Sequence, residues 1–261
     1  MQSNESPGDI YERHIVPAIF STWVPPLLDF VSVKPAERVL DLACGTGVVA
    51  REAVSRVGAS GRVVGLDINS SMLARARATS AAVEWREGNA MDLPFAAGAF
   101  DVVVCQQGLQ FFPDESKALQ EVRRVLVPGG RFAAAVWCDI ESSPGHHALA
   151  LALERHVGVE AATQMYAVFR LGDAQALQMN LASAGFQNVH LRREQQLARF
   201  PSPDLFARWM LAGSVLGRTG VQPRDESLAA LLREVDEALQ PYAAPDGLAF
   251  PMDAHLVIAT R

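Results

Sequence analysis

Short apolar runs alternate with amphipathic stretches between residues 35 and 137. The apolar runs predict β-strands at 38–42, 62–66, 83–86, 100–105 and 131–137. Stretches in which apolar residues recur every three or four positions predict helices at 46–57, 70–79 and 115–126. Strands that alternate with helices imply right-handed crossovers and a parallel sheet with both faces covered.

The pattern changes on either side of this core. Residues 1–34 place apolar side chains at helical spacing, interrupted by prolines, and predict a kinked helical cap. Two long excursions follow the fifth strand, at 139–171 and 201–245. Outside the core, the sequence predicts helices at 173–184 and 228–239 and strands at 188–196 and 253–260.

We therefore predict one α/β domain over residues 35–261. Its two excursions are expected to be lid insertions over the carboxyl edge of the sheet, where open α/β sheets bind ligands. The alternative is that they form a structural cover for the sheet.

The first predicted strand leads into a turn of small residues. Residues 39–47 place a carboxylate, Asp41, before two glycines, Gly45 and Gly47. Glycine lets a backbone come close to a ligand. The second strand ends in another acid, Asp67, where a ribose diol would find a bidentate acceptor. These positions together predict a nucleoside site.

Composition and charge narrow the class of protein. The chain of 261 residues has a formal net charge of −6 and no run of Lys or Arg, so a nucleic-acid partner is not expected. The first 30 residues lack the pattern of a secretory leader, and we find no apolar run of the roughly 18 residues that a membrane span needs. We expect a cytoplasmic protein with no integral membrane segment. The three cysteines lack metal-site spacing, so buried reduced thiols are expected and no metal is predicted.

Five pieces of sequence, in order, carry a resemblance to a known family. They are residues 41–47, 65–73, 88–95, 100–104 and 121–130. Residues 38–137, and more weakly the chain up to Gly185, resemble the class I S-adenosylmethionine-dependent methyltransferases, specifically the group related to ubiquinone and menaquinone biosynthesis methyltransferases. The resemblance implies a doubly wound, seven-stranded, mostly parallel sheet. Its order would be 3-2-1-4-5-7-6 with the last strand antiparallel.

The resemblance also implies which residues bind S-adenosylmethionine. Gly45 and Gly47, with Thr46 between them, would approach the methionine part of the cofactor, and Asp41 would take up its ammonium group. Asp67 would accept both ribose hydroxyls.

Further positions implied by the resemblance surround the adenine and the transferring methyl group. Ile68 and Met72 would flank the adenine, and Asn89 and Ala90 would read its edge. The family places residues close to the methionine part and the methyl group where Gln106 and Gln107 stand.

Two positions depart from the family pattern. Asn89 stands where the family usually has Asp, and its side-chain carbonyl can still accept a hydrogen bond. Ala43 replaces the first glycine of the turn. We therefore expect residue 43 to avoid the positive φ that only glycine visits readily.

Two other functions remain as alternatives. Residues 45–50 also fit the dinucleotide fingerprint G-x-G-x-x-G/A, so an NAD(P)-dependent oxidoreductase is one alternative. Asp41 argues against it, because a carboxylate would sit poorly beside a pyrophosphate. The other alternative is a protein that binds S-adenosylmethionine without turning it over.

Methyl transfer from a sulfonium is an in-line displacement, so a protein mainly has to position the acceptor and exclude water. A base is needed only when the acceptor must lose a proton. His146 and His147, in the first excursion, are candidates for this base. Gln107 is a further catalytic candidate, because the resemblance places it close to the methyl group. Tyr11 is expected to close over the cofactor if the first helix folds back, although packing is an alternative role for it. An apolar acceptor pocket is expected from Trp23, Trp137, Tyr166, Phe169, Trp209 and Met210, which favours a small hydrophobic or aromatic acceptor, with core packing as the alternative. The sequence leaves the acceptor atom (O, N or C) and a homodimer open.

Overall fold

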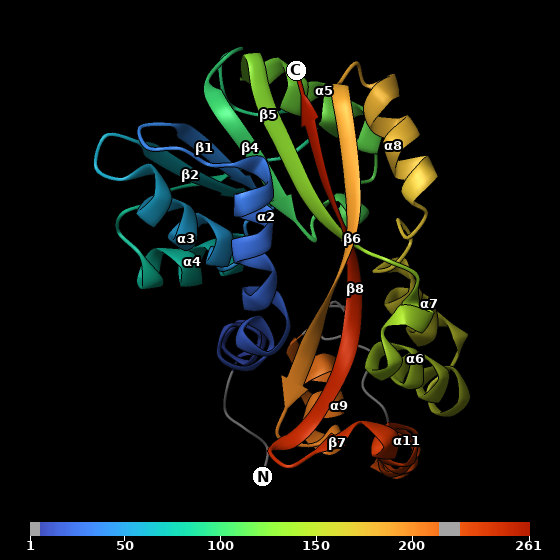
Figure 1. Ribbon diagram of the computed structural model, residues 1–261. Helices are drawn as coiled ribbons and strands as arrows, with labels where there is room; N and C mark the ends of the chain where they lie inside the picture. The colour runs from blue at the N-terminus through green and yellow to red at the C-terminus, as the bar shows by residue number, and fades with distance from the viewer. Residues whose placement is uncertain (1–5, 214–224) are drawn as a thin grey trace. The chain divides into compact units, whose positions relative to one another are not determined.

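The computed structural model describes residues 6–213 and 225–261. Its strands form one sheet in the order β3-β2-β1-β4-β5-β8-β6, with a short β7 paired to β8 (Figure 1). The strands are β1 (Arg38–Leu42), β2 (Arg62–Asp67), β3 (Glu84–Glu87), β4 (Phe100–Gln106), β5 (Leu126–Trp137), β6 (Gln187–Phe200), β7 (Ala243–Ala244) and β8 (Gly247–Thr260). With the two-residue β7 set aside, this is the predicted order, and the predicted fold class is confirmed.

The helices around the sheet lie within the segments that the pattern predicts to be helical. They are α2 (Val24–Val31), α3 (Val48–Val57), α4 (Ser70–Thr79), α5 (Glu115–Val125) and α8 (Ala174–Ser183). α3 packs against β1 and β2, and α4 packs against β2 and β3. α3 begins two residues later than predicted because Gly45 and Gly47 both have positive φ angles, which an α-helix excludes.

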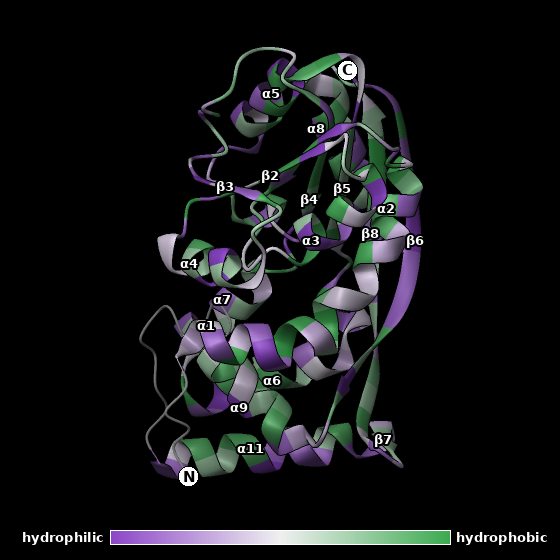
Figure 2. Cartoon of the chain, turned by 90° about the vertical axis from the view of Figure 1, so that its left-hand side faces the viewer, coloured by the Kyte–Doolittle hydropathy of each residue, from purple (hydrophilic) through white to green (hydrophobic). Residues whose placement is uncertain are grey.

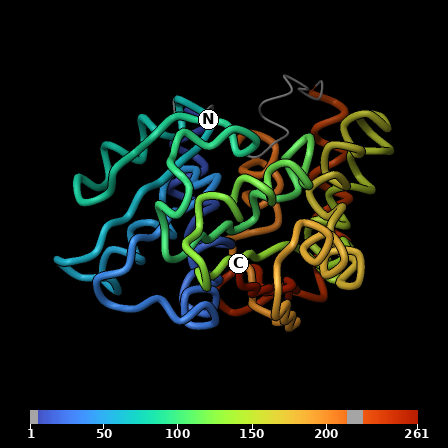
Figure 3. Tube along the Cα trace, turned by 90° about the horizontal axis from the view of Figure 1, so that it is seen from above, coloured from blue at the N-terminus to red at the C-terminus, as the bar shows by residue number. Residues whose placement is uncertain are grey.

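β5 begins five residues before its predicted start. It begins at Leu126, which pairs with Phe100, and its register with β4 shifts before Val102 pairs with Arg131. The shift contains residues 128–130, and Gly129 has a φ of 74°. The backbone N–H of Arg261, at the C-terminus (marked in Figure 3), donates to the carbonyl of Gly130 at 2.9 Å and joins the two segments.

β6 and β8 are longer than predicted and have contrasting surfaces. β8 is buried along most of its length, whereas β6, at the end of the strand order, exposes most of its side chains. Figure 2 shows β6 as hydrophilic along much of its length. Charged side chains on an edge strand hinder pairing with other chains.

The chain divides into two compact units, which we describe separately. The sheet unit comprises Ser21–Val136, Asp173–Glu194 and Ala254–Arg261. The helix-rich unit comprises the described parts of Met1–Phe20, Trp137–Gly172 and Gln195–Asp253. It therefore contains most of both predicted insertions, although this grouping does not test their role as lids or the domain boundary predicted at residue 35.

Helices make up most of the described helix-rich unit. They are α1 (Pro7–Ile10), η1 (Tyr11–Phe20), η4 (Ile140–Ser142), α6 (Pro144–His156), α7 (Val159–Ala167), α9 (Pro203–Gly213), α11 (Asp225–Leu239) and η5 (Gln240–Tyr242). α6 packs against α7 and α11, and α9 packs against α11 and η1. A cluster of aromatic rings, including Phe200, Phe206 and Phe250, fills the interior.

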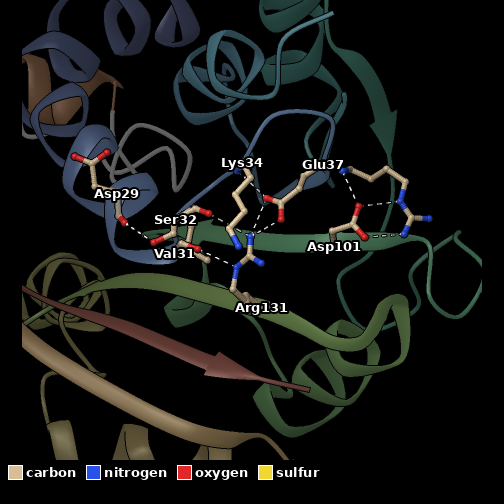
Figure 4. Close-up of polar contacts among 8 residues, drawn as sticks. Asp29, Val31, Ser32, Lys34, Glu37, Asp101 and Arg131 are labelled. Carbon is tan, nitrogen blue, oxygen red and sulfur yellow. Dashed lines mark hydrogen bonds and ion pairs between the residues drawn. The ribbon is translucent and has the colours of Figure 1, made fainter. Parts of the chain in front are cut away.

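The amino edge of the sheet, where β1, β4 and β5 begin, is held by ion pairs (Figure 4). Arg131 donates to both carboxylate oxygens of Glu37, at 2.7 and 2.8 Å, and to the carbonyl of Val31 at the end of α2, at 2.9 Å. Arg38 donates to both oxygens of Asp101, and these bonds hold the pKa of Asp101 below its usual value. Helix ends leave carbonyls without intrahelical partners, so Arg131 also completes the end of α2.

One segment departs from the prediction that no apolar stretch is long enough to span a membrane. Among the described residues, the continuous helical segment Pro7–Val31 reaches the required length, with a mean hydropathy of 1.3 in its most apolar part. Half of that part is buried within the structure. Core helices of water-soluble proteins and signal sequences share these properties, so the segment alone does not indicate a membrane span. It includes Pro17 within a π-helical turn and Pro25 in the first turn of α2, where proline is tolerated.

Candidate nucleoside-binding site

The turn after β1 is built from alternating left-handed residues. Ala43, Gly45 and Gly47 have φ angles of 57°, 55° and 87°. The expectation that Ala43 avoids positive φ is therefore wrong. The geometry of the turn overrides the preference of alanine, at a cost of about 1–2 kcal/mol for one left-handed residue with a Cβ.

The methyl group of Ala43 fits because residue 108 is glycine. A Cβ on Gly108 would lie 2.6 Å from the Cβ of Ala43, which is too close for two carbon atoms. Gly108 follows β4, so the turn after β4 packs directly against the turn after β1. The carboxyl ends of these neighbouring strands thus form one continuous surface.

Gly47 has a second reason to be glycine besides its φ angle. A Cβ at this position would lie 2.1 Å from Cη2 of Trp85, and one on Gly65 would lie 2.4 Å from Cζ3 of the same ring. Gly65 pairs with Trp85 across β2 and β3, so its missing side chain lets the indole reach the start of α3. Trp85 was not among the predicted site residues. The signal that could have found it is a glycine inside a predicted strand, because such a glycine often marks a close approach.

Asp41 begins the polar part of the site and acts as a cap for α3. Its Oδ2 accepts the backbone N–H of Ala50 at 2.9 Å, which is a bond that Gly47, at the N-cap, has no side chain to make. The Asp41 side chain is buried, with 1% exposed, and burial raises its pKa to about 8. The proposed contact of Asp41 with an ammonium group stays a prediction.

Asp67 ties the turn to the second strand. Its Oδ2 accepts the N–H of Gly45 at 2.8 Å, and its Oδ1 accepts the N–H of Asn69 at 2.8 Å. Each carboxylate oxygen can accept more than one hydrogen bond, so both remain able to receive a ribose hydroxyl. Asp67 is partly exposed, which suits a residue that meets a ligand.

The positions expected around the adenine lie on the loops after β2 and β3. Ile68 is 70% exposed, an unusual state for a large apolar side chain, whereas Met72 is buried in the first turn of α4. Asn89 uses its Oδ1 to accept the N–H of Met91 at 3.0 Å, which leaves a second lone pair on that oxygen. Ala90 is buried beside it in the sequence.

Gln106 and Gln107 stand at the end of β4, as predicted. Gln107 also has a positive φ, 56°, and its backbone N–H donates to Ala135 on β5 at 2.8 Å. Thr46 and Gln107 are buried, and within the described residues neither Thr46 Oγ1 nor Gln107 Nε2 has a hydrogen-bond partner. Buried polar atoms usually have partners, so a bound molecule is a natural source of them.

The remaining predicted residues, Tyr11, His146 and His147, lie in the helix-rich unit. Tyr11 packs against Phe20, with ring centroids 5.5 Å apart. The two histidines are in the first turn of α6. Ser143 Oγ and Nδ1 of His146 are 2.8 Å apart, and burial lowers the pKa of His146 to about 3.

His146 is thus buried and not solvated. Its imidazole lies between the rings of Phe169, Phe206 and Phe250, where the neutral form is favoured. His147 is partly exposed. The roles of Tyr11, His146 and His147 stay predictions.

The residues predicted for an aromatic acceptor pocket have different surroundings. Trp23 is buried in the sheet unit. In the helix-rich unit, the ring of Trp209 stacks on that of His14 with ring centroids 4.1 Å apart, and Phe169 packs on His146. These contacts fit the core-packing alternative for Trp23 and Phe169.

The three cysteines are confirmed as free and buried. Burial raises the pKa values of the Cys44 and Cys105 thiols, which keeps them protonated and unreactive. Within residues 6–213 and 225–261, no group of three or more His, Cys, Asp or Glu side chains is arranged to hold a metal ion.

The core of this chain is similar to known methyltransferases. Residues 39–130 match a family described as methyltransferase domain. A 2-phytyl-1,4-naphtoquinone methyltransferase of Thermosynechococcus vestitus is 41% identical over 114 residues, which are 42% of this chain and 51% of that protein. A demethylmenaquinone methyltransferase of Lactococcus lactis subsp. lactis is 46% identical over 98 residues, 36% of this chain and 39% of that protein. The chain thus spans about half the length, or less, of these curated relatives.

Solved structures show the same fold. A SAM-dependent methyltransferase from Aquifex aeolicus superimposes with a TM-score of 0.54 at 18% identity, covering 72% of this chain and 92% of that one. The [4+2]-cyclase SpnF does so with a TM-score of 0.56 at 21% identity, covering 92% and 80%. Residues 39–130 therefore match a methyltransferase domain, which confirms the predicted resemblance to class I S-adenosylmethionine-dependent methyltransferases and S-adenosylmethionine as the cofactor.

Proposed function

We propose that this chain is an S-adenosylmethionine-dependent methyltransferase that acts on a small aromatic or otherwise hydrophobic molecule of the quinone type. The observation that carries the proposal is the hydrogen bond from Gly45 to Asp67, which joins the glycine turn to the acid expected at the ribose. The acceptor class rests on the names of the quinone methyltransferases that match residues of this same core.

The chain's own residues have few tasks in such a reaction. Methyl transfer from a sulfonium is an in-line displacement and needs no covalent enzyme intermediate. Gly45 and Gly47 let the backbone approach the methionine part of the cofactor, and Asp67 orients the ribose through its two carboxylate oxygens. Ile68 offers an exposed apolar face to the adenine. These contacts fix the methyl carbon so that the acceptor can attack from the opposite side.

A proton acceptor is needed only for acceptors that must lose a proton. Of the two candidate histidines, His147 is the better one, because the low pKa of His146 makes its imidazole a weak base at neutral pH. Replacing both by alanine, and each singly, should separate them. Undiminished turnover of the double variant over a pH series would remove both from the mechanism.

Thermal unfolding with added ligands tests the cofactor against the alternatives. S-adenosylhomocysteine should raise the melting temperature, whereas NAD(P)H should not, because only a ligand that binds the folded state stabilises it. Stabilisation by the dinucleotide alone would favour the oxidoreductase. Binding of S-adenosylhomocysteine without turnover of any candidate acceptor would favour a non-methylating protein. The [4+2]-cyclase SpnF, which shares this fold, illustrates that the fold alone does not imply methyl transfer.

We also propose a cytoplasmic location and a homodimer. The location rests on the composition of the chain. Cell fractionation tests the location, and light scattering of the purified protein tests the number of copies. Recovery of the protein in the membrane fraction would contradict the cytoplasmic location. A molar mass of one chain would contradict the homodimer.

A further inference from the structure

The side-chain amide of Gln107 is placed in a way that its sequence position alone does not explain. Gln107 is 5% exposed, and its Nε2 has no hydrogen-bond partner among residues 6–213 and 225–261. Its backbone is left-handed, which is uncommon for a residue with a side chain. Outliers of this kind gather at functional sites, where the surrounding structure holds them in place.

Gln110 determines which end of that amide is left over. The 3₁₀ turn η3 (Leu109–Phe111) brings Gln110, itself 4% exposed, back beside Gln107. Gln110 Nε2 donates to Gln107 Oε1 at 3.3 Å. This bond orients the Gln107 amide and uses one lone pair of its oxygen, whereas the N–H groups of its Nε2 have no partner among the described residues and remain for another molecule.

The amide pair belongs to the same surface as the glycine turn. Gly108 lies between the two glutamines in the sequence, and it is the residue whose Cα packs against Ala43. The Gln107 backbone is in turn anchored to β5 through Ala135. The amide therefore stands at the carboxyl ends of β4 and β5, beside the turn that starts the cofactor site.

We propose that Gln107 Nε2 donates a hydrogen bond to an oxygen atom of a bound molecule, and that Gln110 is a positioning residue that fixes the orientation of the Gln107 amide. An amide N–H donor selects an acceptor atom, so the recognised group is an oxygen. It belongs either to a quinone-type methyl acceptor or to the carboxylate of the cofactor. This inference takes its two candidate ligands from the proposed function. The experiment below distinguishes failure of this inference from failure of the proposed function.

The experiment measures equilibrium binding by calorimetry for three probes. The first is S-adenosylhomocysteine, the second is 2-methyl-1,4-naphthoquinone, and the third is 2-methylnaphthalene, which has the same rings without oxygen. The variants are Gln107→Met and Gln110→Met, with Gln120→Met, an exposed glutamine on α5, as the matched control. Gln107→Glu keeps the shape of the side chain and the acceptor for Gln110 but removes the donor, and serves if Gln107→Met does not fold.

If the oxygen is on the methyl acceptor, both variants should weaken the naphthoquinone about tenfold, as expected for one hydrogen bond, and leave the other two probes within twofold. If the oxygen belongs to the cofactor carboxylate, the affinity for S-adenosylhomocysteine should instead fall about tenfold in both variants. The affinity for 5′-methylthioadenosine, which lacks the carboxylate, should not change. A general packing defect would weaken the oxygen-free 2-methylnaphthalene as well, and would overturn the proposal.

A double variant tests whether Gln110 acts through Gln107. Adding Gln110→Met to Gln107→Met should cause no further loss, because the group that Gln110 orients is already gone. An additive loss would overturn the positioning role. Unchanged binding of the naphthoquinone and of S-adenosylhomocysteine in both single variants would overturn the whole inference.

Failure of the proposed function gives a different result. It would show as absence of S-adenosylhomocysteine binding by the unsubstituted protein, and the naphthoquinone measurement would then decide the role of Gln107 alone. If the unsubstituted protein binds neither probe, both proposals are overturned.

Discussion

The two edges of the parallel sheet satisfy their polar groups differently. At the amino edge, Arg131 and Arg38 each make paired hydrogen bonds to a carboxylate. At the carboxyl edge, Thr46 Oγ1 and Gln107 Nε2 are buried without a partner in the described chain, and burial raises the pKa of Asp41. Left-handed residues with side chains occur at both edges, including Ser32 and Ala43, so backbone strain does not distinguish them.

What separates the edges is therefore the use of their polar groups. A bond between two groups of the protein stabilises the fold and leaves nothing for a ligand. A buried group without a protein partner reduces stability by about 1–3 kcal/mol and stays available. The amino edge is thus built for stability, and the carboxyl edge retains groups for binding, as ligand sites in open α/β sheets generally do.

The largest expected effect is at Asp67. Asp67→Ala removes an ionised acceptor of two predicted ribose hydrogen bonds, so the affinity for S-adenosylhomocysteine should fall by ~3 kcal/mol or more, on the order of a hundredfold. Calorimetric titration measures the change. The affinity for S-adenosylhomocysteine should fall less in Asp67→Asn. It should not change in Glu87→Ala, which removes an exposed acid at the end of β3. An affinity within threefold of the original would contradict the assignment.

At the amino edge, Arg131→Met should reduce stability and not binding. It leaves Glu37 without its guanidinium partner and the end of α2 without a donor, so we expect a loss of about 2 kcal/mol, seen as a lower melting temperature. Arg208→Met, which breaks a half-exposed pair within α9, should cost no more than about 0.5 kcal/mol. A large loss of S-adenosylhomocysteine affinity in Arg131→Met would contradict the division between the edges.

The raised pKa of Asp41 predicts a pH dependence. The folded state keeps the proton of Asp41 up to pH 8, whereas the unfolded state releases it near pH 4, so this group makes the fold less stable as the pH rises between these values. Between pH 7 and pH 8 the contribution should be about 1 kcal/mol, and it should be absent in Asp41→Asn.

Melting curves of both proteins at these two pH values measure that difference. His146 does not contribute in this range, because its lowered pKa makes the fold lose stability only as the pH falls below about 6.5. Parallel pH dependence of the two proteins would show that Asp41 is ionised in the folded state.

The smallest expected effect is at Ala43. Ala43→Gly removes the cost of a Cβ at positive φ, about 1–2 kcal/mol, but adds about 0.5–1 kcal/mol of backbone entropy to the unfolded chain. The free energy of unfolding should therefore rise by about 0.5 kcal/mol, which a higher melting temperature would show. Ala53→Gly, inside α3, should instead lose about 1 kcal/mol. Destabilisation by Ala43→Gly would show that the methyl contact with Gly108 outweighs the strain.

The sequence predicted some parts of the site well and others poorly. β1, α4 and the acids that end or precede the turns were predicted because apolar periodicity and glycine spacing are local properties of the chain. The conformation of Ala43 was predicted wrongly, because local propensity favours negative φ, whereas the geometry of the turn imposes a positive φ and Gly108 leaves room for the methyl group. Trp85 and Gln110 were missed, because their partners lie on another strand or across a turn.

The sequence by itself determined the alternation of strands and helices, the glycine turn with its acid at the end of β2, and the resemblance to methyltransferases. These follow from periodicity and from short motifs, which neighbouring residues specify. The tertiary structure alone decided that Asp41 caps α3, that Trp85 covers Gly47, and that Gln107 presents a donor while Gln110 holds its oxygen. Burial and hydrogen-bond partners depend on residues far apart in the chain, and only packing brings those residues together.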